Sequence, residues 1–456
     1  MKPPLTVAIV GSGPAGFYAA GALLSRDEFD VRVDMYERLP TPWGLVRFGV
    51  APDHPQIKSV SSVFAKTASH DAFHFYGNVE LGRDVTREEL LDRYDAVLYA
   101  VGARADRSLG IPGEHLDGSV AAVDFVGWYN GHPDYADHEF NLQTKRAVVI
   151  GNGNVALDVA RILCSPTERL ATTDIADHAL AALRHSSIEE VVVLGRRGPG
   201  QAAFTTLELR ELPEFTESGV DVDPEQVLEA PDEATLPKLA RRNLAVLRDY
   251  ARSPAPRGAR RMVLRFLRSP IELRGTDRVE DLVVGVNELR TTDDGRLIAA
   301  DTGLREIIET GLVLRAVGYR GLPVAGLPFD NDRGVVTNDG GRVRDAEREY
   351  VTGWIKRGPT GIIGTNKKDA VETVATLLSD LSTGRLIRHS EGLRHAHADI
   401  TAWLTDGRKD VVTEECWQRI DAFERDAGSI VGRPRVKLCQ TSKLLAVAHG
   451  REIESQ

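Results

Sequence analysis

Two glycine-rich turns hold the residues whose types and spacing best suit the binding of a nucleotide. The first turn reads GSGPAG at residues 11–16, and the second reads GNGNVA at residues 151–156. Glycines at the end of a parallel strand let the backbone turn tightly and approach a pyrophosphate, whose charge is met by backbone amides and by the dipole of the next helix. Turns of this spacing also join strands to helices that bind nothing. The residues that follow each turn must therefore indicate whether it binds a nucleotide, and which one. The candidate binding residues are Gly11, Gly13, Pro14, Ala15 and Gly16 in the first turn and Asn152, Gly153, Asn154 and Val155 in the second.

An acidic residue follows the first turn at the distance typical of a ribose contact. The strand expected at 31–36 leads into Glu37, about 20 residues past the turn, where a carboxylate would bind ribose hydroxyls. The alternative is a solvated charge at the end of a strand. The position favours an adenine dinucleotide with free ribose hydroxyls.

Arginines take the place of that acid after the second turn. The strand expected at 191–195 ends in Arg196 and Arg197. A carboxylate would repel a 2′-phosphate, whereas guanidinium groups bind phosphate through paired, charge-assisted hydrogen bonds. Residues 165–190 lengthen the usual spacing, and an ordinary surface arginine pair is the alternative. The second turn therefore predicts NADP(H).

Each turn needs a buried strand before it and an amphipathic helix after it. The β-branched runs at 6–10 and 147–150 predict the strands, and helices are expected over 17–24 and 157–163. Continuous apolar strands that lead into helices indicate parallel sheets covered on both faces. We therefore predict an α/β fold with two Rossmann-like dinucleotide-binding domains. Further elements are expected as strands at 96–102 and 312–318, helices and loops over 221–260, a glycine turn at 358–364 followed by a helix over 367–381, and helical pieces beyond Arg385.

Length and composition exclude several other classes of protein. The 456 residues exceed the roughly 250–300 at which one core stops growing, so two or more domains are expected. No apolar stretch approaches the roughly 18 residues needed to span a bilayer, and a net charge of −10 without a binding motif disfavours nucleic acid. We read the first residues as mature sequence, since the glycines from Gly11 onward interrupt their apolar run.

The three cysteines limit the chemistry further. Cys164, Cys416 and Cys439 lie far apart and form no CxxC pair, which fits a reducing compartment and predicts a cytoplasmic protein without a metal or iron–sulfur site of its own. Thioredoxin and lipoamide reductases need a cysteine pair beside their flavin. If the adenine dinucleotide of the first domain is a flavin, its electrons would therefore leave to a separate acceptor.

Longer strings of sequence resemble one known family. They are GSGPAG at 11–16, LPTPWGLVRFGVAPDHP at 39–55, VDFVGWYN at 123–130, GNGNVALDVARIL at 151–163, GRRGP at 195–199, FTTLELREL at 204–212 and GWIKRGPTGIIGTNKKDA at 353–370. The chain resembles the adrenodoxin-reductase-type ferredoxin–NADP reductases, and the mycobacterial members most of all. The resemblance implies an FAD domain built from residues 1–106 and 320–456, with an NADPH domain, residues 107–319, inserted between its two parts.

The resemblance also implies roles for individual residues. The FAD contacts would be Ala15, Glu37, Leu45, Leu81, Trp354, Gly361, Ile362 and Ile363. The NADPH contacts would be Arg107, Asn152 to Val155, Arg196, Arg197 and Glu208, with Gly361 near both nucleotides. A loop charge before Pro112 is the alternative for Arg107, and an isolated tryptophan such as Trp354 is more often part of a core.

The turn at 358–364 is suited to the flavin ring, because backbone poor in side chains can approach a planar ring. A helix that begins near Thr365 would aim its positive dipole at the ring atoms where negative charge accumulates on reduction; a helix start without a ligand is the alternative. His54 and Glu211 are the candidates for polar contacts on the nicotinamide side. Hydride transfer needs no protein acid or base, so we expect their substitution to change binding or rate modestly.

A local excess of basic residues suggests where an acceptor docks. The segment from Lys238 to Arg268 contains ten basic residues and one acid, Asp249, whereas the whole chain has a net charge of −10. Such a reversal suits the steering of an acidic partner such as an iron–sulfur ferredoxin. The alternative is a solvated helical face with some phosphate-binding arginines.

The leading functional hypothesis is an FAD enzyme that takes a hydride from NADPH and passes single electrons to a ferredoxin. A second hypothesis is an NADPH-dependent flavin reductase or diaphorase that reduces quinones or other small acceptors. A third is a regulatory protein that senses NADP(H) without turnover.

Overall fold

The computed structural model describes residues 4–26, 28–215, 219–228, 236–253, 260–387, 397–406 and 410–453. The chain divides into two compact units. Unit 1 comprises Met1–Val50, His54–Ala105 and Tyr319–Gln456, and unit 2 comprises Ala51–Asp53 and Asp106–Gly318. The short strands β5 (Ala105–Asp106) and β15 (Tyr319–Arg320) pair with each other where the chain passes between the units.

Unit 1 is built on a seven-stranded sheet with the order β18-β19-β20-β4-β1-β2-β3. β20, β4, β1, β2 and β3 pair in parallel, and β18 and β19 add an antiparallel edge. β1, the middle one of the five parallel strands, is buried along its whole length. The strands are β1 (Leu5–Val10), β2 (Val31–Glu37), β3 (Phe73–Gly77), β4 (Ala96–Tyr99), β18 (Asn338–Asp339), β19 (Arg342–Val343) and β20 (Glu349–Val351), with a separate pair β16 (Phe329–Asp330) and β17 (Val335–Val336).

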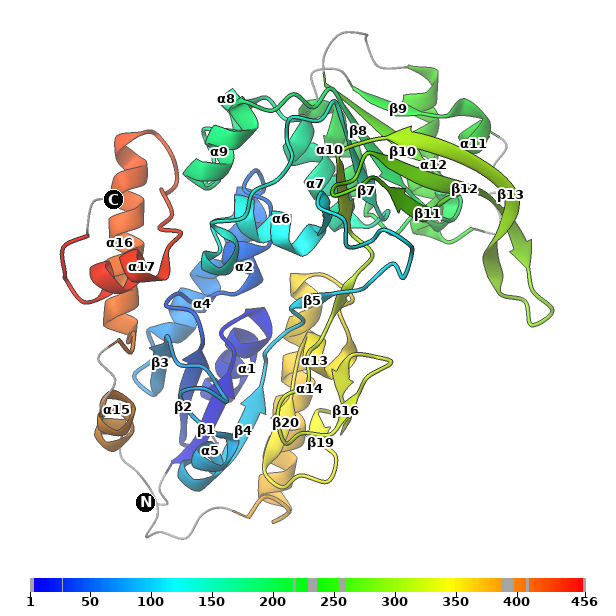
Figure 1. Ribbon diagram of the computed structural model, residues 1–456. Coiled ribbons are helices and arrows are strands. Elements are labelled where there is room, and N and C mark those ends of the chain that lie inside the picture. The colour runs from blue at the N-terminus through cyan, green and yellow to red at the C-terminus, as the bar shows by residue number, and fades with distance from the viewer. Residues whose placement is uncertain are drawn as a thin grey trace. The chain divides into compact units, whose positions relative to one another are not determined.

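Helices α1 and α14 pack against each other in unit 1, and Figure 1 shows α14 lying along the strands of the sheet. Pro14 begins α1, where its fixed φ suits a helix start and its missing N–H costs nothing. In the C-terminal part, α16 packs against both α17 and β3. The helices are α1 (Pro14–Leu24), α2 (Leu45–Phe48), α3 (Pro55–Lys58), α4 (Ser61–Ala68), α5 (Arg87–Arg93), α13 (Trp354–Arg357), α14 (Ile363–Ser382), α15 (His397–Thr405), α16 (Glu414–Ile430) and α17 (Thr441–Ala448).

Unit 2 contains a six-stranded parallel sheet with the order β6-β14-β7-β8-β10-β9. A three-stranded antiparallel sheet, β11-β12-β13, accompanies it, and the β12–β13 hairpin is long (Figure 1). The strands are β6 (Ser119–Ala121), β7 (Arg146–Ile150), β8 (Glu190–Leu194), β9 (Val220–Val222), β10 (Arg261–Arg265), β11 (Arg268–Arg274), β12 (Asp281–Thr291), β13 (Leu297–Glu309) and β14 (Leu312–Arg315).

Helix α7 follows the second glycine turn and packs against β7, β8 and β10 of the parallel sheet. Its apolar residues from Ala156 onward are buried, as expected for a helix that covers a sheet, while Val155 is half-buried. The helices of unit 2 are α6 (Ala122–Tyr129), α7 (Asn154–Cys164), α8 (Thr167–Leu170), α9 (Asp177–Arg184), α10 (Thr206–Phe215), α11 (Pro224–Leu228) and α12 (Lys238–Arg252), with 3-10 turns at Pro133–Tyr135 and Pro199–Gln201.

The α/β architecture predicted from the sequence is confirmed, and the differences lie at the ends of elements. The helices after the glycine turns begin earlier than expected, at Pro14, Asn154 and Ile363, because the last turn residues already form the first helical turn. The strands expected at 96–102 and 312–318 end at Tyr99 and Arg315. Within 221–260, expected to hold only helices and loops, residues 221–222 belong to β9. Within the described residues, no helix is both long and apolar enough to cross a membrane.

Candidate functional site

The first glycine turn in unit 1 combines two tight approaches of the backbone with one open position. A Cβ atom on Gly11, whose φ is +107°, would lie 2.5 Å from the carbonyl oxygen of Ala100, and one on Gly16 would lie 2.1 Å from that of Gly11. A Cβ atom on Gly13 would meet nothing within 4 Å. Gly11 and Gly16 are therefore needed for packing, whereas Gly13 leaves room at the N-terminus of α1 for a group outside the chain.

The carboxylate of Glu37 is fixed beside this turn. Its Oε2 atom accepts hydrogen bonds from the backbone N–H (3.1 Å) and the hydroxyl (2.6 Å) of Ser12, and its Oε1 atom accepts one from the N–H of Leu39 (3.0 Å). An ionised carboxylate has about four acceptor positions, so capacity remains for a ribose hydroxyl. Pro14 and Ala15 are buried in the first turn of α1.

The other three single residues expected at FAD lie apart in the sequence of unit 1. Leu45 begins α2 and is half-buried, and Leu81 forms an isolated bridge with Val85 in a short turn. Trp354 begins α13 and lies against Tyr319 with ring centroids 5.3 Å apart. Its indole Nε1 atom is buried and has no hydrogen-bond partner in the described part of the chain. An orphaned buried donor of this kind suits a bound group with acceptor atoms.

The segment 361–363 forms the N-terminus of α14. Gly361 has a φ of +81° and is exposed, Ile362 is 65% exposed, and Ile363 is the first residue of the helix. A 20-residue helix carries a partial positive charge at this end, where the N–H of Ile362 donates to the hydroxyl of Thr365 (3.2 Å). An exposed apolar residue at the positive end of a helix suits a planar, partly anionic ligand.

The second glycine turn, in unit 2, repeats the plan of the first. A Cβ atom on Gly151 would lie 2.3 Å from the carbonyl oxygen of Ala316, while one on Gly153 would meet nothing within 4 Å. The carbonyl oxygen of Asn152 accepts hydrogen bonds from the N–H groups of Ala203 (2.9 Å) and Phe204 (3.1 Å). The side chain of Asn154 accepts one from the N–H of Thr205 (2.8 Å). These bonds hold the turn, and Val155 continues it into α7.

Arg196 and Arg197 follow β8 with both side chains exposed. Their backbones are held, since the carbonyl oxygen of Arg196 accepts from Asn287 (2.9 Å) and that of Arg197 accepts from the N–H of Leu267 (3.1 Å). Within the described ranges, neither guanidinium group makes a hydrogen bond or ion pair with the protein. Both are therefore available to an anionic ligand such as a phosphate.

Glu208 belongs to a buried cluster of acids in unit 2, around the fully buried Arg161. The guanidinium of Arg161 binds Asp53 in a fork (2.7 and 3.0 Å), Asp158 (2.8 Å) and, more weakly, Glu208 (3.4 Å). Burial and the charge of Asp158 raise the pKa of Glu208 to about 7, although Arg161 opposes the shift. One arginine thus faces several acids, and a carboxyl with such a pKa exchanges a proton near neutral pH.

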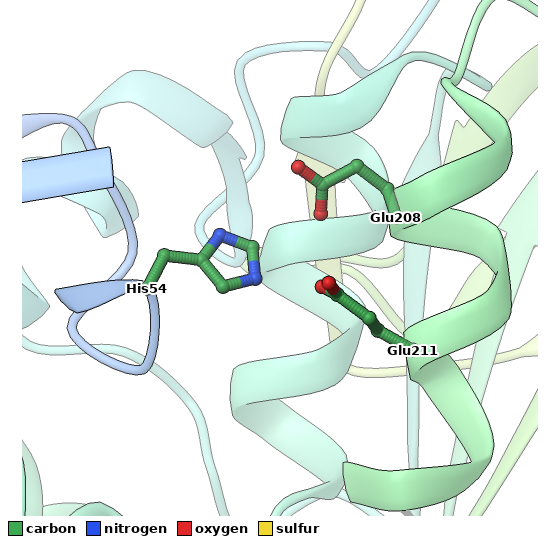
Figure 2. A group of neighbouring side chains, drawn as sticks. All are labelled: His54, Glu208 and Glu211. Atoms are coloured by element: carbon green, nitrogen blue, oxygen red, sulfur yellow. The ribbon is translucent and has the colours of Figure 1, made fainter. Parts of the chain in front are cut away.

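Glu208 and Glu211 project from the same side of α10, one helical turn apart (Figure 2). His54, also drawn in Figure 2, directly precedes the short helix α3 of unit 1. Arg107 lies in an exposed loop of unit 2, with its N–H bonded to the carbonyl oxygen of Gly318 (3.1 Å). The roles of these residues stay predictions.

The basic residues of the run at 238–268 differ in whether their side chains are already paired with acids or backbone groups of the protein. Arg265 and Arg268 both bind Glu306, and Arg261 binds Glu190 and Asp221. Arg260 bonds to backbone carbonyl oxygens, Arg252 pairs with Asp249, and Arg257 lies outside the described residues. Lys238, Arg241 and Arg242 of α12 are exposed and make no ion pair within the described ranges. Arg248 is half-buried and donates to the carbonyl oxygen of Val227 (3.3 Å), so the exposed basic residues without an ion pair in the described part of the run lie in the first two turns of α12.

Sequence reasoning missed the fully buried Arg161 and the acids that bind it. Arg161 and Asp158 lie three residues apart in α7, a spacing that brings two side chains together on one face of a helix, so this pair was open to prediction. Asp53 and Glu208 reach the same guanidinium from other segments, and no local pattern indicates that. Glu114 was missed as well, although its carboxylate accepts hydrogen bonds from Ser108, Leu109 and Gly110 in the loop after Arg107.

Two sheets with parallel cores, each with an open glycine turn and its own strand-end charge, define the class of two-dinucleotide oxidoreductases. Residues 5–197 match the family model described as pyridine nucleotide-disulphide oxidoreductase. The NADPH-ferredoxin reductase FprA of Mycobacterium leprae is 55% identical over 97% of this chain and 98% of that protein. The mitochondrial NADPH:adrenodoxin oxidoreductase of Salvelinus fontinalis is 42% identical over 97% of this chain and 91% of that protein.

A solved structure agrees with these relatives. FprA from Mycobacterium tuberculosis, in complex with NADPH, is 54% identical to this chain and matches it with a TM-score of 0.95, over 98% of this chain and 100% of the other. The chain belongs to the family of NADPH-ferredoxin and NADPH:adrenodoxin reductases.

Proposed function

We propose that this protein is an FAD-dependent NADPH–ferredoxin reductase, which takes a hydride from NADPH and passes electrons one at a time to an iron–sulfur ferredoxin. The observation that carries the proposal is the difference between its two open glycine turns. A fixed carboxylate, Glu37, follows one turn, and two guanidinium groups without a partner among the described residues, Arg196 and Arg197, follow the other. The relatives' names, NADPH-ferredoxin reductase and NADPH:adrenodoxin oxidoreductase, describe the same reaction.

Unit 1 would hold the FAD. Gly13 leaves the space that a pyrophosphate requires, Glu37 presents carboxylate oxygens to ribose hydroxyls, and Trp354 offers a buried indole N–H that no described residue accepts. Leu45, Leu81 and the exposed segment Gly361–Ile363 are the further proposed contacts. Bound FAD would supply the conversion of a two-electron hydride into single electrons.

Unit 2 would hold the NADPH. Gly153 leaves the corresponding space at the start of α7, and Arg196 and Arg197 would bind the 2′-phosphate through charge-assisted hydrogen bonds. Asn152, Asn154, Val155, Arg107 and Glu208 are the further proposed contacts. His54 and Glu211 are proposed to bind and orient the nicotinamide without transferring a proton. Each NADPH would release one proton and reduce two ferredoxins, since each ferredoxin takes one electron.

The partner is proposed to be an acidic ferredoxin that docks at the exposed basic residues of α12. Lys238, Arg241 and Arg242 give this helix a positive face within a chain of net charge −10. We also propose a cytoplasmic location, since all three cysteines, each in the described part of the chain, are free thiols.

The visible spectrum of the purified protein tests the function. A yellow protein that NADPH bleaches under anaerobic conditions supports a flavin reduced by hydride, whereas a colourless protein contradicts the proposal. Cytochrome reduction then identifies the acceptor. A rate that requires added ferredoxin supports the proposed partner, and an equal rate with a quinone alone favours the small-acceptor reductase.

A further inference from the structure

The segment from Trp43 to Phe48 lies directly against the first glycine turn of unit 1. The N–H of Trp43 donates to the carbonyl oxygen of Ser12 (3.0 Å), and a Cβ atom on Gly44 would lie 2.9 Å from Cα of Gly13. Trp43 has a φ of +83°, a conformation that costs a bulky residue energy and persists only where the surroundings hold it. The shape of this segment therefore depends on what packs against it.

The C-terminal part of the chain supplies those contacts. The buried guanidinium of Arg47 binds both oxygens of Glu424 on α16, at 2.9 and 2.6 Å. Lys437 donates to the carbonyl oxygen of Arg47 (3.2 Å). The indole ring of Trp417 meets that of Trp43 edge to face at 5.0 Å, and the Arg47 guanidinium lies over the Trp417 ring at 5.5 Å. The short helix that begins with Leu45 is thus held by Glu424 and Lys437, which lie 377 and 390 positions beyond Arg47 in the sequence.

Glu424 is fully buried, and its carboxylate accepts hydrogen bonds from three different residues. Besides Arg47, it binds Arg435 (3.0 Å) and the N–H of Leu438 (2.9 Å). Burial by itself opposes its ionisation, but Arg47, Arg435 and the N–H of Leu438 together outweigh this and lower the pKa of Glu424. A buried ion pair of this kind adds little net stability compared with apolar packing, while it fixes the geometry of the groups it joins.

We infer that Glu424 is a positioning residue for the FAD pocket. Glu424 acts through Arg47 and holds the Trp43–Leu45 segment against the first glycine turn. This inference rests on the proposed function, since Leu45 is a proposed FAD contact. The C-terminal part of the chain thereby gains a role in cofactor binding. Three of its residues contact the Trp43–Phe48 segment, namely Trp417, Glu424 and Lys437, and none of them is itself proposed to touch FAD.

Two substitutions test the inference. Glu424→Gln removes the charge that Arg47 binds, and Arg47→Lys keeps the charge but cannot form the two-pronged contact, so it remains informative if the first variant does not fold. Glu415→Gln is the matched control, because it breaks an exposed pair with Arg419 (2.5 Å) on the same helix. We expect FAD to leave the two test variants at least roughly tenfold faster, as measured by the rise of flavin fluorescence on dilution, because small displacements in a binding site are costly.

A second readout separates positioning from general stability. The visible circular dichroism of the FAD that remains bound should change in the test variants and stay unchanged in Glu415→Gln. NADP⁺ binding, measured by calorimetry, should stay at the wild-type value in all three. If Arg47→Lys melts at a lower temperature but releases FAD at the wild-type rate with the wild-type dichroism, the inference is wrong. A wild-type protein that holds no FAD would instead contradict the proposed function.

Discussion

At the scale of single residues, the two glycine turns differ in the charge that follows them and in how that charge is held. Glu37 is fixed by Ser12 and Leu39, whereas Arg196 and Arg197 are exposed without a partner in the described part of the chain. A fixed carboxylate suits hydroxyl groups and repels phosphate, while an unpaired guanidinium suits phosphate.

Substitution of Arg196 or Arg197 by alanine should therefore weaken the binding of NADPH and leave that of NADH nearly unchanged. A hydrogen bond to a charged group contributes about 1.5–3 kcal/mol, so each change should raise the KM for NADPH roughly 10- to 100-fold. Steady-state kinetics with both cofactors measures this. Arg290→Ala, at an exposed arginine paired with Glu288, is the control. Equal losses for NADPH and NADH would show that the pair does not read the 2′-phosphate.

The acid cluster around Arg161 leads to a prediction about pH. The pKa of Glu208 is raised from 4.5 to about 7, so between these values the folded protein binds a proton that the unfolded chain releases. The contribution of the Glu208 carboxyl to the free energy of unfolding is complete below about pH 4.5 and is lost as the pH rises through about 7. The loss can reach about 3 kcal/mol, since one pKa unit corresponds to about 1.4 kcal/mol.

Glu208→Gln should remove that part of the pH dependence. Melting temperatures at pH 5 and pH 8 should differ more in the wild type than in the variant. Glu214→Gln, at an exposed acid on the same helix, should behave as the wild type. The same pH dependence in the wild type and in Glu208→Gln would contradict the raised pKa.

At the scale of elements, the loop that carries Arg107 is held by one carboxylate. Glu114 accepts from the hydroxyl of Ser108 (2.7 Å) and from the N–H groups of Leu109 (2.6 Å) and Gly110 (2.8 Å). Burial alone would raise the pKa of Glu114, but these donors and Arg315 lower it. The loop therefore owes its shape to a charged acceptor behind it.

Glu114→Gln should loosen this loop without altering the glycine turn. A neutral amide can accept at only one of its two positions, so some of the three donors lose their partner. We expect the KM for NADPH to rise several-fold with little change in kcat, and the amide hydrogens of Leu109 and Gly110 to exchange faster. Glu139→Gln, at an exposed acid of the same unit, is the control. A changed kcat at constant KM would contradict a role in placing Arg107.

At the scale of the whole molecule, charge separates the proposed docking helix from the rest of the chain. The net charge is −10, while α12 exposes Lys238, Arg241 and Arg242. Such an arrangement accelerates association with an acidic partner at low salt, and ions screen the attraction beyond about 10 Å at 0.1 M.

Reversal of both Arg241 and Arg242 to glutamate should slow the reduction of cytochrome through ferredoxin roughly tenfold at low salt and much less at high salt. The reduction of a small neutral acceptor should be unaffected. Arg274→Glu, at an exposed arginine paired with Glu272, is the control. A rate that falls equally at all ionic strengths would argue against docking on α12.

Local patterns in the sequence were sufficient for most of the fold. The strands at 5–10 and 146–150, the turns after them and the α/β class follow from β-branched runs and glycine spacing, which act within a few residues. The ends of helices were less predictable, because Pro14 and Asn154 serve both the turn and the first helical turn. The C-terminal helices were expected, but their contacts with the Trp43–Phe48 segment were not.

The sequence by itself determined where the two nucleotide turns lie and which charge follows each, because both depend on spacing along a strand, a turn and a helix. Only the tertiary structure decided which charges meet. It brings Glu424 to Arg47, gathers Asp53 and Glu208 at Arg161, and pairs both Arg265 and Arg268 with Glu306. These partners come from different segments of the chain, so the path of the backbone, and no local preference, sets the distance between them. The pair Asp158 and Arg161 is the exception, because both residues lie on one helix.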